Sequence, residues 1–258
     1  MGCAVAALRA GSGMVAAHLA AALLLLATIP SAYAQAPGAS VRLLDGGPRE
    51  DGTHLAGLEI DLEPGWKTYW RMPGRSGLAP QLDFGGSGNV ANVRVLWPAP
   101  HRLTDPYGDA IGYDRRVVLP VIVTPADAED PASLEVTGLI GVCEKVCVPL
   151  DVDARLGLDP DATPGRIARF LDAVPRPATP EEAGGIEARR VADGSALIVA
   201  SAAPVDDIFA SGESVANGLS EPDGAERRIA LLPDGPAEAA ITLTVLRGGT
   251  AFTITLAP

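Results

Sequence analysis

The sequence predicts an all-β protein made of two β-sandwich modules in tandem, joined by a short helix and a proline-rich linker. Stretches of alternating apolar and polar residues recur along most of the chain, and this period of two is typical of half-buried strands. The chain has 29 glycines and 23 prolines among its 258 residues, which favours many turns between short strands. Helical periodicity occurs mainly in residues 159–184, between two β-rich regions.

Residues 1–34 have the form of a secretory signal peptide. Arg9 provides a positive start, residues 14–29 form an apolar run, and Ala32 and Ala34 are the small residues that a signal peptidase reads. The run is short for a membrane anchor, because a spanning helix needs about 20 apolar residues. We therefore expect cleavage after Ala34 and export of a soluble mature chain with no membrane span.

Charge and composition exclude some partners. The formal net charge is −12, and removal of Arg9 with the signal would make the chain more acidic still. An acidic exported protein is a poor candidate for binding nucleic acid or anionic membrane surfaces. We expect no cofactor and no bound metal, and we expect the protein to be a monomer.

The first predicted module spans residues 38–158. Leu58, Ile60 and Leu62 alternate with acidic residues, which predicts a strand with one buried and one solvent-facing side. Pro64 and Gly65 then turn the chain. Further predicted strands lie in NVRVLWP, RVVLPVIVTP, SLEVTGLIGV and VPLDVDARLGL. About eight strands of this kind would close into a β-sandwich.

The predicted linker covers residues 159–184. Thr163 and Pro164 resemble an N-cap followed by proline at the first helical position. Apolar residues then follow at helical spacing, and three prolines end the helix; these are Ile167, Phe170, Leu171, Val174, Pro175, Pro177 and Pro180. The sequence therefore predicts one short helix and a stiff connection.

The second predicted module spans residues 185–258, where period-two patterning returns. Gly248 and Gly249 separate two alternating runs, which predicts a hairpin. This region holds no cysteine or histidine. Because site chemistry usually needs such groups, we expect the second module to support the first structurally.

The chemistry of the chain is concentrated in GVCEKVCVPL, where Cys143 and Cys147 lie four positions apart. Cys3 is lost with the signal, so these two cysteines remain, and an exported chain meets an oxidising environment. A disulfide needs Cα atoms about 4.4–6.8 Å apart, whereas four residues of straight strand cover about 13 Å. We therefore expect a tight turn at residues 144–146, with the cysteines on two flanking strands and accessible to another protein.

Three interpretations of the pair remain open from spacing alone. Closing so small a ring stabilises a fold by only about 2 kcal/mol, which favours a redox-active pair over a structural disulfide. Lys145 would favour a thiolate and Glu144 would oppose it, so no net pKa shift is predicted. A zinc site would need two further ligands such as His54 and His101. A copper(I) site could use the two thiolates, but no tract rich in histidine or methionine supports it.

Several motifs resemble one known family. GWKTYWRMPGRSGLAP, WPAP, DPYGDAIGYDRRVVLPV and GVCEKVCVPL are similar in order and spacing to the N-terminal periplasmic domain of the DsbD/ScsB thiol:disulfide interchange family, also called the disulfide-bond corrector domain. The resemblance covers about residues 40–158 well and extends more loosely to the second module. It implies that both modules are immunoglobulin-like, because ScsB-like periplasmic regions resemble a tandem of two such modules.

The resemblance also implies an electron relay. In this family a membrane domain passes electrons to a thioredoxin-like domain, and the immunoglobulin-like domain accepts them through its cysteine pair to reduce periplasmic partners. Carried over, Cys143 and Cys147 are the redox pair and Cys147 forms the mixed disulfides. This chain shows no membrane bundle and no thioredoxin-like C-x-x-C domain. We therefore expect a separate membrane electron donor and exported thioredoxin-like acceptors.

The family covers its cysteine pair with a loop, and DPYGD matches that loop here. The resemblance implies that Tyr107 shields the pair and that Asp105 is an acid–base or orienting carboxylate. Pro106 stands where some members carry an aromatic residue, and an ordinary turn at Tyr107 and Gly108 is the alternative to a shielding role.

Two other functions stay open beside the relay. One is a non-catalytic immunoglobulin-like binding module with a structural disulfide, and the other is a copper(I)-binding periplasmic protein. A structural disulfide should have a reduction potential below about −300 mV, and a redox-active pair should have a higher one. A redox titration therefore separates the two.

Overall fold

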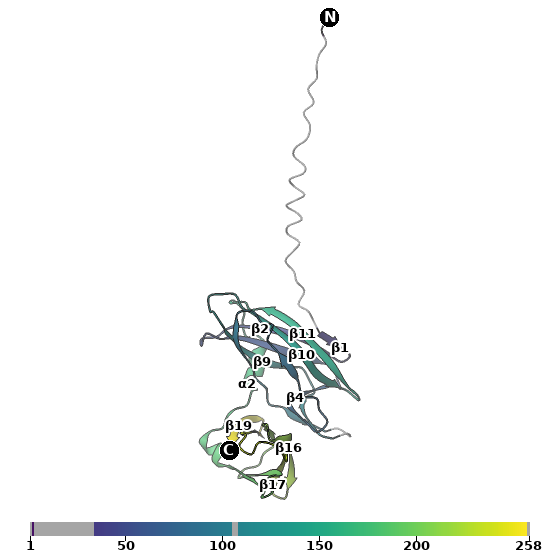
Figure 1. Ribbon diagram of the computed structural model, residues 1–258, viewed down its shortest axis with the longest axis vertical. Coiled ribbons are helices and arrows are strands. Elements are labelled where there is room, and N and C mark those ends of the chain that lie inside the picture. Colours follow the sequence, from purple (N-terminus) through teal and green to yellow (C-terminus); the bar gives the residue numbers. More distant parts are fainter. Residues whose placement is uncertain (1, 3–33, 105–107, 257–258) are drawn as a thin grey trace. The chain divides into compact units, whose positions relative to one another are not determined.

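The computed structural model describes residue 2 and residues 34–104 and 108–256. Strands dominate it and confirm the predicted all-β, tandem immunoglobulin-like fold class (Figure 1). The described strands and helices all lie within Ala32–Pro258, which forms one unit by its internal contacts. None of the helices in this described part is long and apolar enough to cross a membrane.

The first module is a pair of antiparallel sheets. One sheet has the order β1-β2-β3-β9-β6, with bounds β1 (Ala34–Ala36), β2 (Ala39–Pro48), β3 (His54–Leu62), β9 (Val117–Pro125) and β6 (Val90–Val95). The other has the order β11-β10-β4-β8-β7, with β5 paired to β10. Its bounds are β11 (Cys147–Gly157), β10 (Ser133–Cys143), β4 (Lys67–Gly74), β8 (Ala110–Tyr113), β7 (His101–Leu103) and β5 (Gln81–Asp83).

Strand β3 departs from its predicted half-exposed pattern. Leu58 and Ile60 are buried as expected, but Glu59 on the opposite side is only 1% exposed. The linker covers this outer side, where Arg166 Nη1 donates to Glu59 Oε1 at 2.8 Å and Arg42 pairs with the same carboxylate. The alternation therefore predicted the strand correctly. It predicted the exposure of the polar side wrongly, because a segment more than a hundred residues later in the sequence packs over that side.

The linker contains two short helices rather than one. Helix α2 (Ile167–Asp172) begins after Arg166, so the predicted start at Thr163 and Pro164 is wrong. Helix α3 (Pro180–Gly184) begins after Thr179, which forms a capping box with Glu182. Gly165 explains the later start of α2, because its φ of +46° is left-handed and a right-handed helix cannot run through it.

The second module forms an eight-stranded sheet with the order β12-β19-β18-β15-β16-β17-β14-β13. The bounds are β12 (Arg176–Pro177), β19 (Thr250–Leu256), β18 (Ile241–Arg247), β15 (Asp207–Ser211), β16 (Val215–Asp223), β17 (Glu226–Leu231), β14 (Ala196–Ser201) and β13 (Ile186–Arg190). The predicted hairpin across Gly248 and Gly249 is confirmed, since Arg247 pairs with Thr250. Apolar side chains such as Leu243 and Phe252 form the core of this module.

The two modules share a buried apolar contact. Phe209 on β15 and Leu219 on β16 belong to the same core cluster as Trp70 on β4 and Ile111 on β8. The rings of Trp70 and Phe209 lie with centroids 6.4 Å apart. The second module therefore packs against the sheet of the first module that carries the cysteine hairpin.

Candidate functional site

The cysteine pair closes the end of the β10–β11 hairpin. The two strands pair along their whole length, from Ser133 opposite Gly157 to Cys143 opposite Cys147, and Figure 1 shows them side by side. A disulfide joins the two cysteines, whose Cα atoms are 4.1 Å apart. The tight turn expected at residues 144–146 is therefore present, with one cysteine on each flanking strand.

The two cysteines differ sharply in their exposure to solvent. Cys143 is only 1% exposed, whereas Cys147 is an exposed residue. Glu144 and Lys145 in the turn are also exposed, and Val146 beside Cys147 is 74% exposed. A partner protein can therefore approach the pair from the side of Cys147, while Cys143 lies behind it.

Tyr69 is a site residue that the sequence analysis did not identify. It is buried on β4, and its hydroxyl donates to Cys143 Sγ at 2.7 Å and lies 3.2 Å from Cys147 Sγ. The KTYWRM run shows that Tyr69 is in a strand, but only the pairing of Cys143 with Lys67 brings β4 beside the cysteine. A hydrogen-bond donor at this distance stabilises a thiolate and lowers its pKa.

Two glycines make room for the Tyr69 ring. A Cβ on Gly141 would lie 3.1 Å from Tyr69 Cδ2 and 2.8 Å from Leu78 Cβ, and a Cβ on Gly77 would lie 2.6 Å from Tyr69 Cδ1. Real Cβ atoms seldom approach other atoms so closely, because cores are close-packed. A side chain at either glycine would therefore crowd the Tyr69 ring together with Leu78 or Pro73.

A small apolar cluster surrounds the buried cysteine. Leu103 on β7 and Ala110 on β8 pack with Tyr69 and Cys143. These two residues flank the DPYGD loop, of which Asp105 and Tyr107, together with Pro106, lie outside the described residues. Where the described chain resumes, the carbonyl of Gly108 accepts a hydrogen bond from Ser76 Oγ at 2.9 Å.

His54 and His101, the histidines of the described residues, are paired with carboxylates instead of with the cysteines. His54 Nε2 lies 2.6 Å from Asp45 Oδ1, and His101 Nε2 lies 3.2 Å from Asp114 Oδ1. Within residues 34–104 and 108–256, no group of three or more His, Cys, Asp or Glu side chains is placed to hold a metal ion. The zinc arrangement with both cysteines and both histidines is therefore not formed in this structure.

These features define a β-sandwich protein with an accessible disulfide at the tip of a hairpin. Residues 41–157 match the family model "Thiol:disulfide interchange protein DsbD, N-terminal". Over these residues the chain is therefore similar to the DsbD N-terminal domain, and this similarity supports a role in thiol:disulfide interchange.

A solved structure extends the likeness beyond the first module. The N-terminal periplasmic domain of ScsB from Proteus mirabilis superposes with a TM-score of 0.65 at 20% sequence identity, covering 87% of this chain and 96% of that chain. Because the family match ends at residue 157, this coverage shows that the likeness in fold includes the second module. No curated protein matches the chain in sequence.

Proposed function

We propose that this protein relays electrons in the periplasm through Cys143 and Cys147 to exported thioredoxin-like partners. The observation that carries the proposal is the asymmetric disulfide, with Cys147 exposed and Cys143 buried beneath the Tyr69 hydroxyl. Thiol–disulfide exchange needs one sulfur that a partner can reach and a second sulfur that resolves the mixed disulfide. The pair offers one residue suited to each task.

The exchange proceeds in two steps from the reduced protein. The Cys147 thiolate attacks one sulfur of the partner's disulfide, whose S–S bond breaks, and the partner's other sulfur leaves as a thiolate and takes a proton. The Cys143 thiolate then attacks Cys147 Sγ and releases the partner's second thiolate, which also takes a proton. The partner gains two electrons and two protons, and the Cys143–Cys147 disulfide forms.

Tyr69 suits the second of these steps. While Cys147 is bound to the partner, Cys143 must ionise although it is buried, and burial in apolar surroundings disfavours a thiolate. The Tyr69 hydroxyl, 2.7 Å from Cys143 Sγ, can donate to that charge. Tyr69 thereby keeps the resolving sulfur reactive in an otherwise apolar cluster.

The periplasmic location and the electron donor are parts of the same proposal. The signal-like residues 1–34 support export, and the solved ScsB relative is described as a periplasmic domain. Regeneration of the dithiol needs a reductant, for which we propose a separate membrane protein that carries a reactive dithiol. Its cysteines would reduce Cys143–Cys147 by the same exchange run toward this protein.

Trapping of the mixed disulfide tests the proposed function. Cys143→Ala removes the resolving sulfur, so it should accumulate covalent adducts with exported thioredoxin-like proteins, whereas Cys147→Ala should accumulate few. Non-reducing electrophoresis of an exported-protein extract, with mass spectrometry of the adducts, makes the measurement. The double alanine variant is the control.

Two results would contradict the proposal. Adducts only with Cys147→Ala would reverse the roles of the two cysteines. A wild-type disulfide that stays intact in redox buffers poised below about −300 mV, together with no adducts from either variant, would leave a binding module with a structural disulfide.

A further inference from the structure

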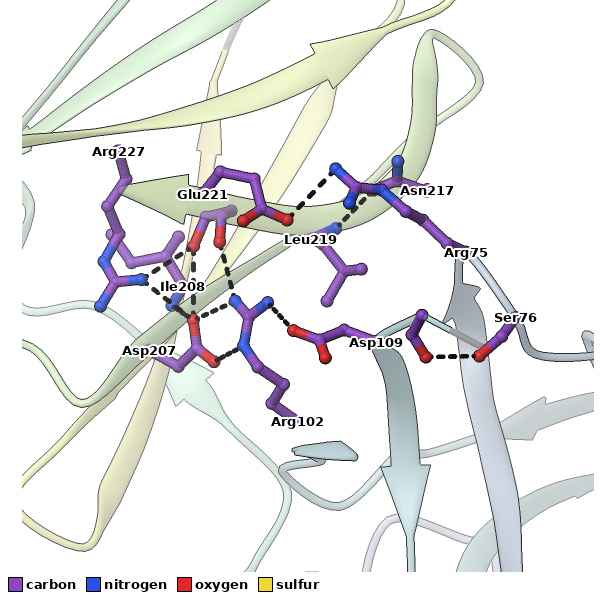
Figure 2. A network of polar contacts seen from close by, with 12 residues as sticks. Arg75, Ser76, Arg102, Asp109, Asp207, Ile208, Asn217, Leu219, Glu221 and Arg227 are labelled. Carbon is purple, nitrogen blue, oxygen red and sulfur yellow. Dashed lines mark hydrogen bonds and ion pairs between the residues drawn. The ribbon is translucent and has the colours of Figure 1, made fainter. Parts of the chain in front are cut away.

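An ion-pair network joins the second module to the sheet that carries the cysteine pair. Arg102 on β7 donates from Nε to Asp207 Oδ2 at 2.9 Å and from Nη2 to Asp207 Oδ1 at 3.0 Å. Its Nη1 donates to Asp109 Oδ2 at 3.1 Å, and its Nη2 also donates to the Ser220 carbonyl at 2.7 Å. Figure 2 shows Arg102 between Asp109 of the first module and Asp207 of the second.

This network is stronger than an ordinary surface ion pair. The side chains of Arg102 and Asp207 are only 21% and 13% exposed, and Arg227 lies 3.4 Å from the same Asp207 carboxylate. Burial alone would lower the pKa of Arg102, but its hydrogen bonds with Asp207 and Asp109 outweigh burial and raise it. A bidentate, partly buried pair holds two planar groups in one orientation.

A second set of contacts holds the end of β4 and the residue that follows it. The Arg75 backbone N–H donates to the Asp109 carbonyl at 3.0 Å, and the Arg75 side chain pairs with Glu221 of the second module at 3.2 Å. A Cβ on Gly218 of the second module would lie 2.4 Å from Met72 Cγ. The second module thus contacts β4 at Met72 and the residue after β4 at Arg75, which in turn holds Asp109 before β8.

These anchored residues are immediate neighbours of the cysteine cluster. Arg102 precedes Leu103, and Asp109 precedes Ala110. Leu103 pairs with Ala110 across β7 and β8, and both pack against Tyr69 and Cys143. Arg102 within β7 and Asp109 immediately before β8 are therefore tied to the network, and the next residue after each belongs to the buried redox cluster.

We propose that the second module is a positioning element of the redox site, acting through Asp207 and Arg102. By holding Arg102 and Asp109, it keeps Leu103 and Ala110 packed on Tyr69 and Cys143, and so limits access to the buried sulfur and favours the disulfide geometry. The inference rests on the proposed function of the cysteine pair. Asp207 and Arg102 touch neither sulfur, so they are positioning residues.

The test compares full-length variants that differ in this network. Asp207→Asn keeps the size of the side chain but removes its charge, and Arg102→Lys keeps the charge but loses the fork that binds both oxygens. Glu226→Gln is the matched control, because it breaks the exposed 2.9 Å pair with Arg189 inside the second module. Each change is made in the wild type and in a Cys147→Ser background, where Cys143 is the reactive cysteine of the mature chain.

Two measurements report on positioning. The first is the rate at which iodoacetamide alkylates Cys143 in the Cys147→Ser background, and the second is the equilibrium constant of the intact pair with glutathione. We expect Asp207→Asn and Arg102→Lys to raise the alkylation rate about three- to tenfold and to shift the glutathione equilibrium about threefold, the usual size of coupling through a packed network. Glu226→Gln should stay within about twofold of its parent.

The outcomes separate this inference from the proposed function. The positioning role would be overturned if a network variant that keeps the wild-type melting profile shows the same alkylation rate and glutathione equilibrium as Glu226→Gln. The relay would remain supported in that case, provided that the wild-type pair is reversibly reduced. Arg102→Lys leaves the residues of the second module unchanged. It therefore still tests the positioning role in the event that Asp207→Asn unfolds that module. A wild-type pair that stays oxidised in buffers poised below about −300 mV, with no mixed-disulfide adducts, would overturn the relay. The alkylation rates would then still decide the coupling.

Discussion

Tyr69 is the residue that links the packing of the first module to the chemistry of its cysteines. Its ring fits against Gly77 and Gly141, and its hydroxyl reaches Cys143 Sγ at 2.7 Å. The same side chain therefore fills the core and supplies a hydrogen bond to the sulfur. Phenylalanine would keep the first property and lose the second, so the two can be separated by experiment.

We predict that Tyr69→Phe raises the pKa of Cys143, measured in the Cys147→Ser background from the ultraviolet absorbance of the thiolate. A hydrogen bond to a charged group contributes about 1.5–3 kcal/mol, which corresponds to a rise of roughly one to two pH units. The sign follows because the lost donor stabilises only the thiolate. Tyr113→Phe is the matched control, since the Tyr113 hydroxyl is buried but donates to the Pro98 carbonyl. Equal pKa values in the two variants would show that Tyr69 does not act on the sulfur.

The β10–β11 hairpin is the element that presents the pair. Its strands pair continuously from Ser133 and Gly157 to the cysteines, and apolar residues such as Val136 and Val152 anchor it in the core. The disulfide therefore connects two residues that the ladder already holds opposite one another. The hairpin should keep its register when the disulfide is reduced, as a reversible pair requires.

We predict that the double variant Cys143→Ala, Cys147→Ala lowers the free energy of unfolding by about 2 kcal/mol or less, the value for closing so small a loop. Urea denaturation compared with the oxidised wild type gives the difference, and far-UV circular dichroism should show the same strand content. A much larger loss of stability would favour a structural disulfide over a redox-active pair.

At the scale of the whole molecule, the two modules are coupled by a shared core. Phe209 and Leu219 of the second module lie in the cluster that contains Trp70 of the first. All three tryptophans, Trp66, Trp70 and Trp97, belong to the first module. Tryptophan fluorescence therefore reports on the unfolding of the first module, and its response to substitutions in the second module can be measured.

We predict that Leu219→Ala moves the urea transition seen by tryptophan fluorescence to lower concentration, with a loss of about 2–5 kcal/mol, the usual cost of truncating a buried leucine. Leu232→Ala makes the same chemical change at a side chain that is 44% exposed, so it should have little effect. If the fluorescence transition does not move in Leu219→Ala, the two modules unfold independently.

Local patterns in the sequence determined the strands, the tandem of β-modules and the turn that opposes Cys143 to Cys147. Each of these depends on residues close together in the chain, where periodicity and disulfide geometry act directly. The same kind of local reasoning misplaced the start of α2, because the signals at Thr163 and Pro164 do not reveal that Gly165 adopts a left-handed conformation.

Only the tertiary structure decided which residues surround the cysteines. Tyr69 is 74 positions from Cys143, and Arg102 is 105 positions from Asp207. The sequence predicts that Glu59 faces solvent, whereas in the structure Arg166 of the linker pairs with it. The alternation of apolar and polar residues predicts which face of a strand is buried, but it does not predict which distant strand or linker packs against either face. Strand register and the packing of the second module supply that information, because they arise from the burial of apolar surface shared by distant parts of the chain.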